Sequence, residues 1–196
     1  MGIPRYRVNV DVDLAKKLIE RSSEKGVDFA FSDELTLDHA FTFPLAYLRP
    51  EADVPIIPIF TNVMAPPIPS AKRFFEVGMV IRQVVEGLPD GLRVGVVCSG
   101  HLSTEIGGPR MLAGAPDRAF DDWSIGLVGR GDVASVIRGV TMSRMAKAGN
   151  YTAGFLNFVM LMGIAGGAPA TQAECIRIGK NNAPILRWGS TEEAAQ

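Results

Sequence analysis

Apolar residues recur at helical spacing in two segments of the first half of the chain. Between Val12 and Lys25 they alternate with charged residues so that they gather on one face, and Gly26 follows as a stop signal. A second apolar face begins after Ser70, a residue suited to cap a helix N-terminus, and continues to Leu88. The pattern predicts an amphipathic helix over each segment.

Short continuous apolar runs separate these helices and are typical of strands that are buried on both faces. The runs cover residues 27–32, 54–60 and 93–98. Pro55 and Pro58 lie within the second run, which indicates an edge position or irregular strand ends. The order helix, strand, loop, strand, helix, strand predicts an α/β domain, layered around a mostly buried central sheet with helices flanking it.

The second half of the chain has mainly helical patterns. Residues 120–140 predict one or two helices with a capped restart at Asp132, and a further helix follows Gly149. Its apolar run, residues 155–165, is too short for a membrane span, which needs about 20 apolar residues. We expect it in a protein core or a subunit interface. One domain should cover residues 1–188, with 189–196 as a polar tail.

The composition is that of a globular protein with no charge excess. The 196 residues are 47% hydrophobic, and 20 basic against 21 acidic residues give a net charge of -1. This balance argues against nucleic acid or an anionic membrane as a partner. Cys98 and Cys175 lie outside any C-x-x-C spacing, and the first ten residues do not resemble a secretory signal. These features predict reduced thiols and a cytoplasmic protein.

The only two histidines, His39 and His101, are expected in loops beside predicted strands. His39 follows Asp38, and His101 follows the strand predicted at 93–98, at the strand end where open α/β sheets bind ligands. Each alone could be a structural loop histidine. Together they suit a shared pocket in which one acts as an acid or base. No G-x-S-x-G motif or phosphate-binding loop offers another chemistry.

Four segments occur in an order and spacing that identify a resemblance to a known family. They are FAFSDELTLDHAFTFPL, DVPIIPIFTNVMAPPIPSAKRFFEVG, VGVVCSGHLSTEIGGPR and FDDWSIGLV. Together they resemble the catalytic domain of class III (LigB-type) extradiol ring-cleavage dioxygenases, which include the protocatechuate 4,5-dioxygenase group. The resemblance runs from about Gly2 to about Gly167. It implies a LigB-like fold, a catechol-like aromatic substrate and Fe(II) held by two histidines and one glutamate.

The resemblance also implies roles for individual residues. His39 matches the D-H position of the family's pocket, and His101 is the nearest match to its catalytic histidine. The family commonly writes that loop G-G-L-S-H, and Thr104 stands where its histidine would be. We therefore expect His101 and His39 as candidate catalytic residues. His39, Ser99, Thr104 and Asn62 are the expected substrate contacts.

The sequence departs from the family at the metal ligands. The family's two iron-binding histidines precede anything equivalent to MGIPRYRVNV, and Gly154 stands where the glutamate ligand would be. Two metal histidines and one catalytic histidine require three, whereas the chain has two. We expect no metal ligands and no cofactor in this chain alone.

Three hypotheses follow from these departures. The first is a degenerate homologue that works as a non-catalytic or accessory subunit and keeps an aromatic pocket. The second is an active dioxygenase whose metal ligands are completed by another chain. The third is a binding protein for aromatic compounds. Because loss of the family's first strands would expose a sheet edge, we also expect an oligomer, with copies of itself or with a dioxygenase subunit.

Overall fold

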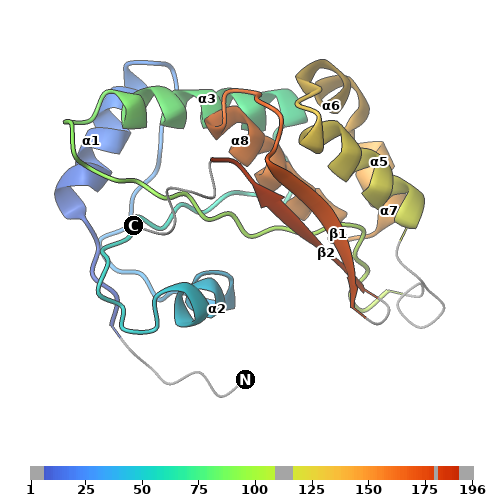
Figure 1. Ribbon diagram of the computed structural model, residues 1–196, viewed down its shortest axis with the longest axis horizontal. Coiled ribbons are helices and arrows are strands. Elements are labelled where there is room, and N and C mark those ends of the chain that lie inside the picture. Colours follow the sequence, from blue (N-terminus) through green and yellow to red (C-terminus); the bar gives the residue numbers. More distant parts are fainter. Residues whose placement is uncertain (1–6, 109–116, 179–180, 190–196) are drawn as a thin grey trace. The chain divides into compact units, whose positions relative to one another are not determined.

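The computed structural model describes residues 7–108, 117–178 and 181–189 (Figure 1). The chain forms two compact units. The first comprises Met1–Thr61 and Gln83–Ser99, and the second comprises Asn62–Arg82 and Gly100–Gln196. The predicted polar tail lies outside the described residues, apart from Gly189.

Both predicted amphipathic helices are confirmed. Helix α1 spans Val12–Ser23, and the Asp11 carboxylate accepts a hydrogen bond from the Leu14 N–H at 2.9 Å. Helix α3 spans Ala71–Glu86, where the Ser70 hydroxyl accepts from the Arg73 N–H at 3.3 Å. Each cap satisfies one of the N–H groups that a helix leaves open at its first turn.

The region around His39 is helical, where the sequence predicted a loop. Helix α2 spans His39–Leu48 and includes Pro44. Asp38 caps it, because its carboxylate accepts from the Ala40 N–H at 2.9 Å. An N-cap of this kind and the apolar residues after it stabilise a short helix despite the internal proline.

The mixed α/β class is confirmed, but the predicted strands do not form a central sheet within the described residues. Within the described chain, residues 27–32, 54–60 and 93–98 form no strand ladder. Only an isolated parallel bridge joins Val10 to Ile56. A ladder needs a neighbouring strand along its whole length, and Pro55 and Pro58 have no N–H to donate to one.

The sheet that the structure does contain is an antiparallel hairpin that the sequence did not predict. Strand β1 spans Gln172–Ile178 and strand β2 spans Asn181–Arg187, with Gln172 opposite Arg187. The hairpin packs against helix α5, Arg118–Gly129, where a β-carbon on Gly129 would lie 2.8 Å from that of Ala173 (Figure 1).

Most of the described core belongs to the second unit. The predicted capped restart is confirmed, because Asp132 caps helix α6, Val133–Gly139. Helix α7, Met142–Ala148, leads to a 3-10 helix η1, Thr152–Phe155, and then to helix α8, Leu156–Ile164. Phe155 and Leu156 are fully buried, which confirms that this apolar run belongs to a core. No described helix is long and apolar enough to cross a membrane.

Helix α8 crosses the first part of α3 at backbone contact. A β-carbon on Gly78 would lie 2.1 Å from the Met160 carbonyl oxygen. A β-carbon on Gly163 would lie 2.3 Å from the Phe75 carbonyl oxygen. Real side chains cannot approach so closely, so glycine at both positions lets the two backbones pack directly.

Candidate functional site

The His101 loop is the best-defined part of the predicted site, and it lies wholly in the second unit. Leu102 and Ser103 are buried, while His101 itself is exposed. The His101 ring meets the Tyr151 ring edge-on, with centroids 6.2 Å apart. The loop thus presents an imidazole beside a phenol, two groups that can exchange protons or hydrogen bonds with a ligand.

The buried carboxylate of Asp121 holds this loop in place through hydrogen bonds to Ser103. Asp121 of α5 is fully buried and accepts hydrogen bonds from the Ser103 N–H and hydroxyl, both at 2.7 Å. Asn182 of β2 donates to the same carboxylate at 2.6 Å. A buried carboxylate is tolerated where its oxygens accept several hydrogen bonds, and these three fix Ser103 against α5 and the hairpin.

Hydrogen bonds also join the loop to the segment that follows helix α7. The Thr104 N–H donates to the Thr152 hydroxyl at 3.2 Å, and the Thr104 carbonyl accepts from the Tyr151 N–H at 3.0 Å. Further along, the Ile106 N–H donates to the Asn150 side chain at 2.9 Å. Hydrogen bonds therefore hold the loop at Ser103, Thr104 and Ile106. Because His101 lies two residues before Ser103, these bonds restrict its orientation.

Gly154 lies against His101 without room for a side chain. A β-carbon on Gly154 would lie 2.8 Å from the imidazole Cδ2 and 3.0 Å from the His101 backbone nitrogen. On the other side, a β-carbon on Gly100 would lie 2.6 Å from the Gly154 carbonyl oxygen. In this conformation the His101 ring and backbone fill the space that a side chain at position 154 would need, so a carboxylate there could not be accommodated.

Two of the other predicted substrate contacts, Asn62 and Thr104, have structural partners. The Asn62 amide donates to the carbonyls of Ala65 at 2.6 Å and Pro67 at 3.3 Å and accepts from the Ala65 N–H at 3.0 Å. It thus stabilises its own turn. The Thr104 hydroxyl donates to the Leu102 carbonyl at 3.0 Å.

His39 and Ser99 belong to the first unit, whereas His101 belongs to the second. Both His39 and Ser99 are exposed. The pocket that His39 and His101 were expected to share therefore stays a prediction.

No pattern in the sequence predicted the contribution of Asp121, Asn150, Tyr151 and Thr152 to this loop. The FDDW segment was recognised, but nothing in it distinguishes the buried Asp121 from the exposed Asp122. Contacts from α5 and β2 to the loop join residues far apart in the chain. The spacing of the loop itself could not reveal them.

Among the described residues, no group of three histidine, cysteine, aspartate or glutamate side chains is placed to hold a metal ion. Three ligands from this set are the usual minimum for a protein metal centre of the kind that the resemblance implies. The side chains present in the described structure therefore do not fit an iron site.

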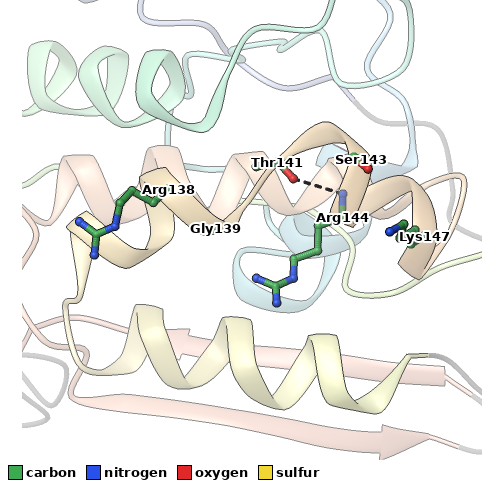
Figure 2. Close-up of a pocket in the computed structure, with 6 residues that line it drawn as sticks. All are labelled: Arg138, Gly139, Thr141, Ser143, Arg144 and Lys147. Atoms are coloured by element: carbon green, nitrogen blue, oxygen red, sulfur yellow. Dashed lines mark hydrogen bonds between the residues drawn. The ribbon is translucent and has the colours of Figure 1, made fainter.

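A basic hollow of about 340 Å³ lies between helices α6 and α7, and none of the predicted site residues lines it. Figure 2 shows its lining, and the three cations do not converge on a common point there. The guanidinium of Arg144 instead lies 4.0 Å above the ring of Trp123. Thr141 caps α7 by accepting from the Arg144 N–H at 3.3 Å. These contacts describe helix packing. The lining residues are Arg138, Gly139, Thr141, Ser143, Arg144 and Lys147.

Burial also affects the cysteine that precedes the His101 loop. It raises the pKa of the Cys98 thiol from 9.0 to about 12. Desolvation, with a smaller contribution from the charges of Asp121 and Asp122, raises the pKa of Cys175. Both cysteines are free thiols. Neither environment activates a thiolate near neutral pH.

Comparison with known proteins gives a family match over nearly the whole chain. The family described as "Catalytic LigB subunit of aromatic ring-opening dioxygenase" matches residues 3–190. Gallate dioxygenase of Pseudomonas putida is 34% identical over 86 residues, which is 42% of this chain and 25% of that protein.

Two further relatives share the name 2,3-dihydroxyphenylpropionate/2,3-dihydroxicinnamic acid 1,2-dioxygenase. The Photorhabdus laumondii protein is 36% identical over 105 residues, 53% of this chain and 32% of that protein. The protein of Mycobacterium sp. (strain MCS) is 36% identical over 115 residues, 58% of this chain and 36% of that protein. The matched region thus spans between a quarter and about a third of these relatives.

Proposed function

The chain belongs to the LigB family of aromatic ring-opening dioxygenase subunits, and we propose that it acts there as an accessory subunit that binds an aromatic ligand without cleaving it. The observation that carries this proposal is the contact between Gly154 and His101. The position that the resemblance assigns to a glutamate ligand has no side chain, and a β-carbon there would lie 2.8 Å from the imidazole.

The proposed ligand is a catechol-like aromatic with an acidic side group. Relatives are named for gallate and for 2,3-dihydroxyphenylpropionate, which both carry adjacent hydroxyls and a carboxylate. In this chain His101 and Tyr151 could hydrogen-bond to ring hydroxyls, and the edge of Tyr151 could pack on the ring face. His39 would contribute from the first unit if the two histidines share the pocket.

The proposal covers location and assembly as well. Free Cys98 and Cys175 suit a reducing cytoplasm. As an accessory subunit the chain would work in an oligomer, alone or with a dioxygenase chain that holds the iron. No catalytic step is assigned to its own residues, because they do not fit the metal.

The first experiment is iron loading under anaerobic conditions. The purified chain is reconstituted with Fe(II), its iron content is measured, and oxygen consumption is followed with gallate, protocatechuate, catechol and 2,3-dihydroxyphenylpropionate. We expect neither stoichiometric iron nor turnover. Stoichiometric iron with turnover by this chain alone would overturn the accessory role. Turnover only after addition of a second chain that carries the missing ligands would favour the split-enzyme alternative.

The second experiment tests the ligand site directly by calorimetry with the same four compounds. His101→Ala should weaken binding by roughly tenfold, the loss expected for one hydrogen bond to a polar ligand group. His101→Gln is the conservative comparison, because it keeps a donor and acceptor. Ser143→Ala, an exposed residue of the basic hollow, is the matched control and should leave binding unchanged. Equal affinity for all variants would show that the ligand does not bind at His101.

A further inference from the structure

The β1–β2 hairpin of the second unit is attached to helix α5 at two separate places. At the open end of the hairpin, the Ala170 N–H donates to the Gly129 carbonyl at 3.0 Å, and a β-carbon on Gly129 would lie 2.8 Å from that of Ala173. At the other end, where β2 begins, the Asn182 amide donates to the Asp121 carboxylate at 2.6 Å. Two attachments fix the direction of the hairpin along the helix.

The distance between these two attachments is the same on both elements. Helix α5 advances eight residues between Asp121 and Gly129, which corresponds to about 12 Å. On the hairpin, Asn182 stands opposite Arg177, and β1 advances four residues from Ala173 to Arg177, about 13 Å. A hairpin that lies along α5 therefore brings Asn182 to Asp121 without bending either element.

A single carboxylate oxygen joins the hairpin to the His101 loop. Oδ2 of Asp121 accepts from the Asn182 amide at 2.6 Å and from the Ser103 hydroxyl at 2.7 Å. Oδ1 accepts from the Ser103 N–H at 2.7 Å. Asp121 is fully buried, and a hydrogen bond in the protein interior is electrostatically stronger than one in water. A shift of the Asn182 amide would therefore change the position of the oxygen that holds Ser103.

The connection from Ser103 back to His101 is short and tightly packed. Leu102, which lies between them, is 1% exposed. On the other side of His101, a β-carbon on Gly100 would lie 2.6 Å from a carbonyl oxygen of η1. Protein interiors packed at this density pass a displacement on to their neighbours. The direction of the His101 ring, and with it the edge-on contact with Tyr151, therefore depends on where Ser103 is held.

We propose that Asn182 is a positioning residue for the candidate ligand site. Through the shared carboxylate and Ser103, it sets the direction of the His101 ring beside Tyr151. The consequence for ligand affinity rests on the proposed function, because the ligand is the catechol-like aromatic proposed for these two rings. Coupling between two sites is reciprocal, so a ligand that binds His101 in this orientation also stabilises the contact between the hairpin and α5. A residue that only fastened the hairpin would affect stability and leave the His101 ring unchanged.

Nuclear magnetic resonance of the histidine rings in the full-length chain tests the proposal without a ligand. The chain has only two histidines, and His101→Gln identifies the signals of His101 by their loss. Asn182→Leu keeps a side chain of similar size but removes the donor. The His101 signals should shift in this variant, and the cross-peak between the His101 and Tyr151 rings should weaken.

Gln172→Ala is the matched control on the same hairpin. Gln172 lies at the open end, and its amide donates to the Glu174 carboxylate within β1 at 3.0 Å. This change should leave the His101 signals and the cross-peak as they are in the wild type. Equal shifts in Gln172→Ala and Asn182→Leu would overturn the proposal, since any disturbance of the hairpin would then move the ring.

A second variant keeps the test decisive if Asn182→Leu does not fold. Ser103→Ala removes the hydroxyl bond to the same oxygen and keeps the N–H bond to Oδ1, so it should shift the same His101 signals. The double variant should shift them by less than the sum of the single changes, because both residues act on one oxygen. Unchanged His101 signals in a folded single variant, or additive shifts in the double variant, would contradict the positioning role.

Calorimetry with gallate, protocatechuate, catechol and 2,3-dihydroxyphenylpropionate separates this proposal from the proposed function. Asn182→Leu should weaken the binding of a compound that the wild type binds by roughly threefold to tenfold, as for the loss of one hydrogen bond. Gln172→Ala should not. Shifted His101 signals in a chain that binds none of the four compounds would support the positioning role and count against the ligand site. Unweakened binding by Asn182→Leu would overturn the positioning role and leave the ligand site in place.

Discussion

Gly154 and His101 are in such close contact that a β-carbon on the glycine would stand 2.8 Å from the imidazole Cδ2 and 3.2 Å from the histidine Cβ. The glycine is therefore a requirement of the His101 loop as it is folded. Restoring a carboxylate at this position should disturb the loop before it could serve a metal.

The variants Gly154→Ala and Gly154→Glu test this relationship. Alanine should lower the free energy of unfolding by about 1–3 kcal/mol, since overpacking forces the loop or η1 to move. Glutamate should lower it further without adding stoichiometric iron. Urea denaturation and metal analysis provide the measurements. Gly95→Ala is the control, because nothing lies within 4 Å of a β-carbon there. Iron uptake by Gly154→Glu with unchanged stability would contradict this reading.

Asp121 should be the most sensitive acidic residue in the second unit. Asp121→Ala removes the acceptor of three hydrogen bonds, from Ser103 and Asn182, and should lower the free energy of unfolding by about 3 kcal/mol. The neighbouring Asp122→Ala is the comparison, because Asp122 is exposed and should change stability by no more than about 0.5 kcal/mol. Similar losses for the two variants would show that the buried carboxylate does not hold the loop.

Replacing a helical glycine by alanine should have opposite effects on stability at Gly78, where α3 crosses α8, and at Gly126 in α5. Gly78→Ala should destabilise by about 1–3 kcal/mol, since its β-carbon would lie 2.1 Å from a backbone oxygen that no rotamer change can move. Gly126→Ala in α5 meets only the end of the flexible Arg130 side chain, at 3.2 Å. It should be neutral or stabilise by up to about 1 kcal/mol through helix propensity. The midpoint temperature of thermal unfolding measures both effects: it should fall for Gly78→Ala and stay the same or rise for Gly126→Ala. Changes of the same sign in both variants would contradict the prediction.

The Cys98 thiol should react slowly in the folded protein and affect stability only at high pH. Folding raises its pKa from 9.0 to about 12, so the fold favours the neutral thiol. This contribution is complete below about pH 9 and is lost as the pH rises from 9 towards 12. A disulfide reagent at pH 8 should modify Cys98 far faster in urea than in buffer, with Cys175→Ser used to isolate its signal. Equal rates in both conditions would rule out the burial effect.

Elements defined by neighbouring residues could be predicted from the sequence. Helices α1 and α3 and the restart at Asp132 have caps and apolar spacing that lie within a few residues of each other. Helix α2 was missed because Pro44 and its aromatic residues obscure the pattern. The strands at 27–32, 54–60 and 93–98 were predicted from composition, but whether a strand pairs depends on distant segments that composition does not reveal.

In the candidate site, too, only the features set by neighbouring residues could be predicted. His101 could be found because it is one of two histidines and follows an apolar run. The residues that hold its loop could not, since the bond from Asn182 to Asp121 spans 61 positions and that from Thr104 to Thr152 spans 48. The role of Gly154 needed both approaches, because the resemblance marks the position and the geometry shows why only glycine fits it.

The uneven distribution of buried apolar residues between the two units has a consequence for how the chain resists a protease. Local opening requires less free energy where few side chains are packed, so cleavage should begin in the first unit, after exposed basic residues such as Lys25 or Arg93. The segment from Phe120 to Met162 should survive longest. Any molecule that binds the first unit would slow those early cuts, so the digestion pattern of the chain would report on binding to that unit.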